Sequence, residues 1–531
     1  MIKRYDVYVC LGLAVLSLIT SLIIADGRYA LGPDGCRLIN GAINLAEGNG
    51  LVNNIVDKNT TEILLEPIVT KPPFYHLLIA SLIKLGIEGK TAAWLISQFS
   101  FIASTSFLYL IARIILPVLP SLLVGLLFAI NVPHLIWSIH AKAVMLMILC
   151  IFISLFLLSY YKKKTADTLK PHQLIWIGIF TALAVLSRYL GITLFITISV
   201  SLLFSIIFNR KKIMDFIWFQ TGIFIAACLP FFIFLTNYLQ GNLPQFRPRG
   251  QISKWFEISA AIVSRLQSDF LGTAVIWLND PSFFDIAFII IVFLAILLLA
   301  ITEAKRNPVV LNLSLFVIVH LFFLWYRLSK AGLSSEALDA NYVLPVQGFL
   351  LLFTVSFLWN GFSKSKFRAV YATVSVIAFT TYCYGQYVRF EEFYNYPKGE
   401  RLSREICKSP KTIDWIKDNI PKASIIMGPQ GLYQLIAETN DYHWMPVPPA
   451  DKYPDTPEFH EKWSEKDFVQ IQQKTNASWI VIFNCAKGDP LFNTPGYGSF
   501  VAGLFNGIGT NAIKLIKKLE DGYVYKIQPD I

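Results

Sequence analysis

Charged residues are scarce in this chain of 531 residues. Asp, Glu, Lys and Arg together make up 15% of it, whereas 55% of the residues are hydrophobic. Soluble domains are about a quarter charged, and the mean hydropathy here is +0.53. The composition therefore excludes an ordinary soluble protein and predicts a mainly α-helical, polytopic membrane protein.

Several signatures of other protein classes are missing. The seven cysteines form no C-x-x-C pair, and no G-x-G-x-x-G or P-loop pattern indicates a nucleotide site. His134 and His140 have no third ligand at a zinc-like spacing. The net charge of +11 comes largely from short basic clusters between apolar segments, which indicates membrane orientation rather than nucleic-acid binding. We expect no metal, no cofactor and no nucleic-acid partner.

Apolar runs long enough to cross a bilayer, which takes about 20 residues, occur about eleven times. They are residues 7–25, 92–116, 120–138, 143–160, 173–187, 189–208, 213–237, 284–302, 308–326, 341–360 and 369–387. The segment 74–85 follows Pro72-Pro73 and is too short to span, so it is interpreted as interfacial.

The positions of the basic clusters test this assignment of membrane spans. With Lys3 and Arg4 inside, the clusters at 162–164, 210–212, 305–306 and 364–368 all fall on the cytoplasmic side. The sequence then predicts a multi-pass protein of the cytoplasmic membrane with three pieces outside, residues 26–91, 238–283 and 388–531.

The last of these pieces has a soluble-like composition. Strand-like runs at 423–427, 478–483 and 522–527 alternate with helix-like runs such as 411–419 and 511–521. We predict a transmembrane domain over residues 1–387 and an extracytoplasmic α/β domain over residues 388–531.

Three charged residues on the predicted outer face could carry chemistry. Asp34 stands at the start of an amphipathic segment, 34–47, of the kind that rests in the headgroup layer. Lys71 precedes a second interfacial segment, 73–86, and Arg188 lies in a turn between two spans. Each has a structural alternative: a helix cap for Asp34, a snorkelling cation for Lys71 and a paired charge for Arg188.

Together the three suit group transfer from a lipid phosphate. A phosphate leaving group needs fixed positive charge, and an acceptor hydroxyl needs a carboxylate base. We expect partial burial to raise the pKa of Asp34 and so improve it as a base.

Four stretches carry a resemblance: PDGCRLINGAINLAEGNGL, TKPPFYHLLIASLIKLG, LSRYLGITL and NYVLPVQGFLLL. In this order they resemble the GT-C superfamily of polyprenyl-phosphate-sugar-dependent glycosyltransferases. More narrowly, they resemble family 39, the protein O-mannosyltransferase and aminoarabinose-transferase group. The resemblance in the order of elements extends over most of residues 1–360. The C-terminal domain resembles that of the family only in its general type.

The resemblance implies that Asp34 is catalytic and that Lys71, with Arg188, binds the donor phosphate. Where many relatives have a second acid, this chain has Gly35. Where many have an acid-proline pair, it has Lys142-Ala143, and Asn341 replaces an arginine. The missing second acid predicts metal-independent transfer, and the missing acid and arginine leave open a diverged, inactive member.

The predicted function is inverting transfer of a sugar from a polyprenyl-phosphate donor to a hydroxyl of a glycan, lipid or protein acceptor. A non-catalytic GT-C-like protein and a lipid or sugar transporter remain alternatives. Further candidates for lining the cavity are Tyr75, His76, His140, Lys142, Tyr189, Glu336, Asp339 and Tyr342.

Overall fold

The structure is a computed structural model. It describes residues 3–25, 33–54, 66–68, 71–165, 169–208, 213–239, 308–331, 342–395, 410–428, 435–436, 439, 441–446, 465–483, 503–504 and 506–528. The predicted span 284–302 and the candidates Glu336 and Asp339 lie outside these residues, as does Asn341.

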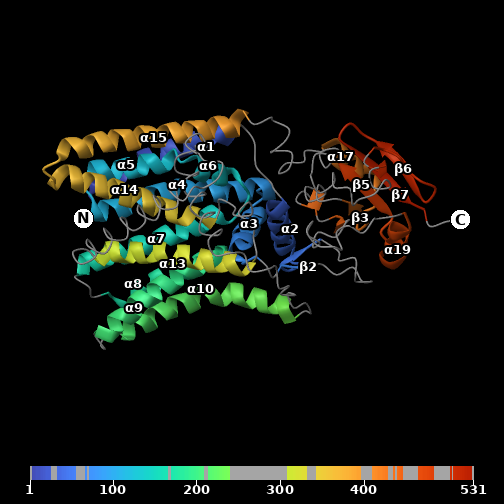
Figure 1. The fold of residues 1–531 in the computed structure, drawn as a ribbon. Coiled ribbons are helices and arrows are strands. Elements are labelled where there is room, and N and C mark those ends of the chain that lie inside the picture. Colours follow the sequence, from blue (N-terminus) through green and yellow to red (C-terminus); the bar gives the residue numbers. More distant parts are fainter. Residues whose placement is uncertain are drawn as a thin grey trace.

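A bundle of long helices forms most of the molecule (Figure 1). Its members are α1 (Arg4–Ala25), α4 (Gly89–Ile115), α5 (Val118–Ala129), α6 (Val132–Ile139), α7 (Val144–Thr165), α8 (Pro171–Ser187), η1 (Tyr189–Gly191), α9 (Ile192–Phe208), α10 (Ile213–Leu239), α13 (Pro308–Ala331), α14 (Leu344–Lys364) and α15 (Arg368–Asn395). Within the described residues, six helices are long and apolar enough to cross a membrane, or seven if one bent pair is counted.

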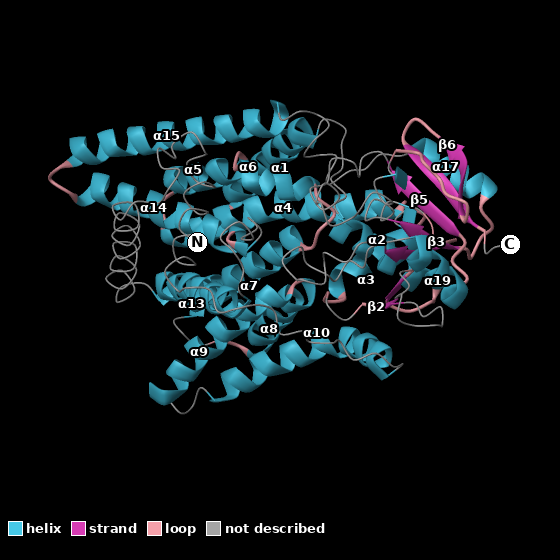
Figure 2. Ribbon diagram, turned by 45° about the vertical axis from the view of Figure 1, so that its right-hand side comes forward, coloured by secondary structure: helices cyan, strands magenta, loops and turns pink. Residues whose placement is uncertain are grey.

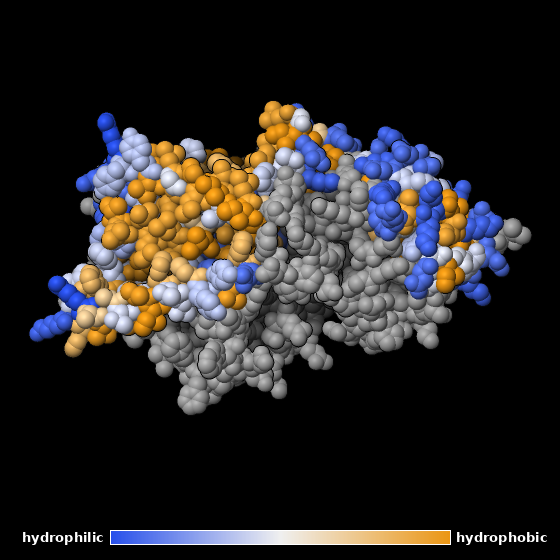
Figure 3. All heavy atoms as spheres, turned by 90° about the horizontal axis from the view of Figure 1, so that it is seen from above, coloured by the Kyte–Doolittle hydropathy of each residue, from blue (hydrophilic) through white to orange (hydrophobic). Residues whose placement is uncertain are grey.

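The outside of this bundle is apolar. Val7 and Leu11 of α1 are 56% and 59% exposed, and Phe224 of α10 is 71% exposed. Seen from above, the bundle is covered with hydrophobic side chains, whereas the C-terminal end of the molecule carries hydrophilic ones (Figure 3). So large an apolar surface on a water-soluble monomer would be exceptional. The chain is a multi-pass membrane protein.

The predicted span 120–138 is two helices rather than one. α5 and α6 meet at an angle of 52°. Asn131 caps α6 by accepting a hydrogen bond from the His134 backbone N–H, and Pro133 occupies the first turn. A side-chain cap and an N-terminal proline start a new helix at this point, which the uninterrupted apolar sequence concealed.

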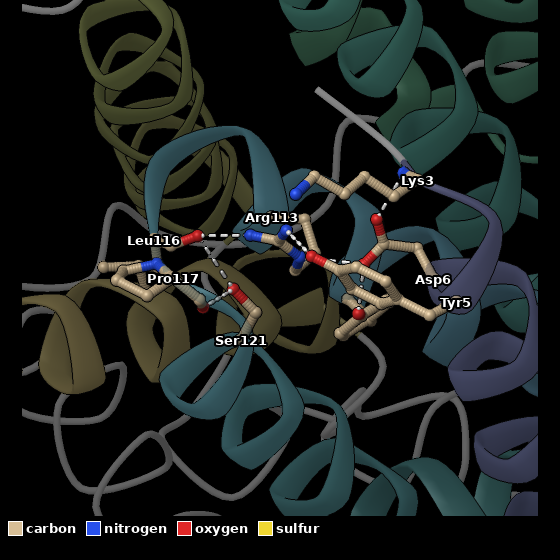
Figure 4. Close-up of polar contacts among 8 residues, drawn as sticks. Lys3, Tyr5, Asp6, Arg113, Leu116, Pro117 and Ser121 are labelled. Carbon is tan, nitrogen blue, oxygen red and sulfur yellow. Dashed lines mark hydrogen bonds and ion pairs between the residues drawn. The ribbon is translucent and has the colours of Figure 1, made fainter.

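A buried ion pair joins α1 and α4 at the end of the bundle that holds the N-terminus (Figures 1 and 4). The Asp6 carboxylate is fully buried and accepts hydrogen bonds from Arg113 Nε at 2.9 Å and Tyr109 Oη at 2.6 Å. The Lys3 backbone N–H donates a third, at 2.7 Å. A buried carboxylate is tolerated because it is paired with a cation and accepts three hydrogen bonds.

Two shorter helices, α2 (Pro33–Glu47) and α3 (Phe74–Lys84), pack against each other at the opposite end, which we call the α2–α3 end. The 11 residues of α3 extend about 16 Å, so this helix is too short to span, as the sequence predicted. A small antiparallel pair, β1 (Val52–Asn53) and β2 (Glu66–Pro67), lies between them in the chain.

Two polar residues of the predicted interfacial helix α2 are buried by protein. Asn40 and Asn44 are 0% and 1% exposed. Asn40 Nδ2 donates to the carbonyl of Ile436 at 2.6 Å, and its Oδ1 accepts from the Asn54 backbone N–H at 2.8 Å. The Trp444 backbone N–H donates to the Asn54 carbonyl at 2.6 Å. The C-terminal region therefore covers the polar face of α2.

This C-terminal region contains a five-stranded mixed sheet with strand order β4-β3-β5-β7-β6 (Figure 2). Its elements are α17 (Pro410–Asn419), β3 (Ile425–Gly428), β4 (His443–Pro446), α19 (Glu465–Thr475), β5 (Trp479–Phe483), β6 (Ile513–Lys518) and β7 (Gly522–Ile527). β3 pairs in parallel with β4 and β5, whereas β7 pairs antiparallel with β5 and β6. The α/β class and the three predicted strands are confirmed.

The predicted helix over residues 511–521 was wrong, because its centre is β6. Ile513 and Leu515 face β7 across an antiparallel ladder with a bulge before Lys517. Residues 519–521 form the turn of the hairpin, which the Leu519 backbone N–H closes by donating to the Gly522 carbonyl at 2.9 Å. Lysines suit β6 because it is an edge strand, and their spacing between apolar residues imitated a helical period.

Candidate active site at one end of the helical bundle

Asp34 and Lys71 form an ion pair at the α2–α3 end. The Lys71 Nζ lies 3.0 Å from Asp34 Oδ2. Asp34 is in the first turn of α2, one residue inside the helix rather than at the predicted cap position, and Lys71 precedes the two prolines that start α3. The side chains are 50% and 35% exposed, so solvent and a bound molecule can reach both.

The start of α2 is placed by close backbone packing. A Cβ atom on Gly35 would lie 3.0 Å from the Ala141 carbonyl oxygen and 3.3 Å from the Ala141 Cβ. Only glycine lets the first turn of α2 approach the 140–143 turn this closely. A larger side chain at position 35, where the resemblance implies a second acid in many relatives, would require this turn to move.

The same turn brings in a second lysine, Lys142. Its Nζ lies 4.6 Å from the ring centroid of Trp137, and its carbonyl accepts a hydrogen bond from Ser97 Oγ at 3.3 Å. Ser97 in turn lies 3.1 Å from the hydroxyl of Tyr75, which donates to the Ala93 carbonyl at 2.9 Å. Residues of α3 and α4 thus hold the backbone that carries Lys142.

Arg188 forms a third cationic position, between α8 and η1. Its guanidinium carbon lies 5.8 Å from the ring centroid of Tyr342, a cation–π contact. The Tyr342 carbonyl is 2.9 Å from His320 Nε2, and His320 Nδ1 is 2.9 Å from Thr193 Oγ1. Thr193 of α9 and His320 of α13 therefore fix the position of Tyr342, which contacts Arg188. No sign of this support is visible in the sequence, because His320 lies inside an apolar run.

The charges of this site act on one another. Burial raises the pKa of Asp34, but Lys71, with Lys142 and Arg37, lowers it by more. The expectation that the pKa of Asp34 is raised was therefore wrong, because a cation at 3.0 Å outweighs desolvation. Burial lowers the pKa of Lys71; Asp34 opposes this shift, and Arg188 and Lys142 add to it. Among the residues that the structure describes, the Asp34 carboxylate thus shares this site with several cations.

Other predicted residues lie behind or beside this cluster. Tyr75 and His76 are fully buried, so they support the site from within α3. His140 is 4% exposed and its Nδ1 is 2.7 Å from the Ile136 carbonyl. Tyr189 is 47% exposed. In the described part of the chain, no group of three or more His, Cys, Asp or Glu side chains could hold a metal ion.

Part of the chain matches a known protein family. Residues 70–234 match the family described as dolichyl-phosphate-mannose-protein mannosyltransferase. No curated protein matches the chain by sequence.

The fold is similar to that of ArnT from Cupriavidus metallidurans in the apo state, with 12% identity, a TM-score of 0.59 and 98% of each chain covered. It is also similar to ArnT bound to undecaprenyl phosphate, with 11% identity, a TM-score of 0.53 and 97% of each chain covered. A third similar structure is the apo oligosaccharyltransferase of Archaeoglobus fulgidus, with 11% identity, a TM-score of 0.56 and coverage of 91% of this chain and 70% of that one.

The chain is thus an integral membrane protein with a GT-C fold. This fold and the family match of residues 70–234 are the features that the chain shares with membrane glycosyltransferases.

Proposed function

We propose that this protein is a GT-C glycosyltransferase that transfers a sugar from a polyprenyl-phosphate donor to an acceptor hydroxyl, with Asp34 as general base. The observation that carries the proposal is the ion pair between Asp34 and Lys71, in which both side chains are partly exposed. A related ArnT structure contains undecaprenyl phosphate. The acceptor is a hydroxyl of a glycan, a lipid or a protein.

The reaction exchanges one bond for another at the anomeric carbon. The acceptor oxygen attacks this carbon from the face opposite the phosphate, so its configuration inverts. The bond between the carbon and the phosphate oxygen breaks, and its electron pair stays on the phosphate. Asp34 takes the hydroxyl proton, a role that requires hydrogen-bond reach of the acceptor. Lys71 and Arg188 stabilise the charge that develops on the phosphate.

The ion pair suggests how donor binding prepares the base. With Lys71 beside it, Asp34 has a lowered pKa and is a weak base. A donor phosphate competes for the Lys71 ammonium, because lysine binds phosphate as a point charge. When the Lys71 side chain moves from Asp34 to the phosphate, the Asp34 carboxylate loses its main stabilising partner. The pKa of Asp34 then rises, which makes it a better base once the donor is bound.

The balance of charges favours catalysis without a metal ion. A divalent cation is usually held by several oxygen ligands, carboxylates among them. In the described part of the site, the Asp34 carboxylate lies among cations that lower its pKa, and these would repel a metal ion and attract a phosphate. We also propose that the α2–α3 end faces outward, since the basic cluster of Lys162 to Lys164 ends α7 at the other end.

The test compares Asp34→Asn and Lys71→Met with wild type in purified protein, using a labelled polyprenyl-phosphate sugar. Asp34→Asn should lower transfer about 10²- to 10⁴-fold and leave donor binding intact, whereas Lys71→Met should weaken donor binding. Glu47→Gln is the control, because Glu47 is an exposed carboxylate at the far end of the same helix. Normal transfer by folded Asp34→Asn would refute the base assignment.

A further inference from the structure

The 140–143 turn places Lys142 beside the proposed donor site in a defined position. Ala141 packs on Gly35, next to Asp34 in the chain. Trp137, which is only 7% exposed, lies under the Lys142 ammonium, with its ring centroid 4.6 Å from Nζ. The backbone of Lys142 is tied to Ser97 on α4. Packing and hydrogen bonds therefore hold this lysine near the pair of Asp34 and Lys71.

Lys142 adds positive charge beside a pair whose own charges cancel. Asp34 and Lys71 neutralise each other at 3.0 Å. Lys142 adds a further positive charge that acts on both members of the pair, and it is held against the ring of Trp137. A polyprenyl-phosphate sugar is a phosphodiester with one negative charge. The polyprenyl phosphate that leaves is a phosphomonoester, with a charge of about −1.5 to −2 near neutral pH.

We propose that Lys142 is an additional phosphate-binding residue that meets the second negative charge, which appears as the sugar leaves. This inference rests on the proposed function and goes beyond it, because it separates the roles of the two lysines. Lys71 binds the phosphate throughout the reaction, whereas Lys142 contributes most when the bond between carbon and oxygen has broken. Interactions that strengthen only as charge develops accelerate the chemical step itself.

Binding of three farnesyl compounds of increasing charge tests this assignment in the purified full chain. Farnesol is neutral, methyl farnesyl phosphate has the single charge of a donor, and farnesyl phosphate has the second charge of the leaving lipid. Lys142→Met should raise the Kd for farnesyl phosphate about tenfold or more, raise that for the methyl ester less, and leave that for farnesol unchanged. Lys142→Arg should retain the preference for the monoester.

Lys164→Met is the matched control. Lys164 also lies over an aromatic ring, that of Tyr160, at 5.8 Å, but at the other end of α7. The Lys164→Met variant should bind all three compounds as wild type does. Inorganic phosphate is included to identify the source of the anion. Binding as tight as that of farnesyl phosphate would indicate a site for free phosphate and overturn the lipid assignment.

The possible failures are distinguishable. If Lys71→Met weakens both phosphates and Lys142→Met weakens neither, the role of Lys142 is refuted and the proposed function stands. If wild type binds farnesol as tightly as the phosphates, the proposed function itself fails. Equal weakening of all three compounds would mean that Lys142 is only structural. Thermal unfolding checks each variant, and Lys142→Gln replaces the methionine variant if that one does not fold.

Discussion

The Lys71 ammonium lies 3.0 Å from the Asp34 carboxylate, although 37 residues separate them in the chain. The residue proposed to bind the donor phosphate is therefore the partner of the residue proposed as base. In isolation either side chain has an ordinary structural explanation, a capped helix or a snorkelling cation. Their pairing on a partly exposed surface, with Arg188 and Lys142 acting on the same pair, gives each a chemical context that neither has alone.

The first prediction concerns the pH dependence of transfer. Asp34 must be deprotonated to act as base, and its lowered pKa places the acid limb of kcat/KM below the ordinary carboxyl value of about 3.9. Lys71→Met removes the main cause that lowers this pKa, so the acid limb should move to higher pH. The residual kcat/KM of the variant, measured between about pH 4 and 8, checks this. An acid limb in the wild-type position would show that Lys71 does not set the pKa of Asp34.

The second prediction concerns the contact between Gly35 and Ala141. A methyl group at position 35 would meet the Ala141 carbonyl oxygen at 3.0 Å, so Gly35→Ala should lower the free energy of unfolding by about 1–3 kcal/mol. It should also lower transfer, because the turn that holds Lys142 has to move. Gly12→Ala is the control: a Cβ on Gly12 meets nothing within 4 Å, so this helix should gain slightly in stability. Chemical denaturation in detergent compares the two, and equal effects would contradict the packing argument.

Sequence reasoning located Asp34, Lys71 and Arg188 but not the residues that position them. The charged residues were identifiable because a charge beside an apolar span is conspicuous. Ser97 and His320 lie inside helices, where polar side chains in an apolar run have no visible partner. Their roles depend on contacts between α4 and the 140–143 turn, and between α13 and Tyr342. Such contacts are set by tertiary packing.

For the fold, likewise, the sequence predicted most of the elements but not the contacts between them. Long apolar runs identified most of the helices, but the break at Asn131 depends on one side-chain cap. The amphipathic pattern of α2 was identified, whereas its environment was not. Its polar face is covered by the carbonyl of Ile436, 396 residues away from Asn40, and amphipathicity cannot distinguish water from a polar protein surface. β6 was mistaken for a helix because an edge strand with few buried residues has no clear alternation.

The third prediction concerns the ion pair between Asp6 and Arg113, at the opposite end of the bundle. Asp6→Asn or Arg113→Met leaves a buried partner without its counter-charge, which costs about 3–5 kcal/mol. The double variant should lose less than the sum of the two, since no uncompensated charge remains. Thermal unfolding of the singles and the double measures this coupling. Additive losses would indicate that the two side chains act independently despite their 2.9 Å separation.

The last prediction concerns the attachment of the C-terminal region to the helix that carries Asp34. Asn40→Ala leaves the Ile436 carbonyl and the Asn54 N–H without these partners, and each buried unsatisfied group costs about 1–3 kcal/mol. The variant should expose residues 435–446 to proteolysis and hydrogen exchange while the bundle stays protected. Asn49→Ala is the control, because Asn49 is exposed and its side-chain hydrogen bonds are long, at 3.3 Å. If Asn40→Ala also slows transfer while donor binding is unchanged, the C-terminal region positions α2 for catalysis. Unchanged protection of residues 435–446 would show instead that other contacts hold this region in place.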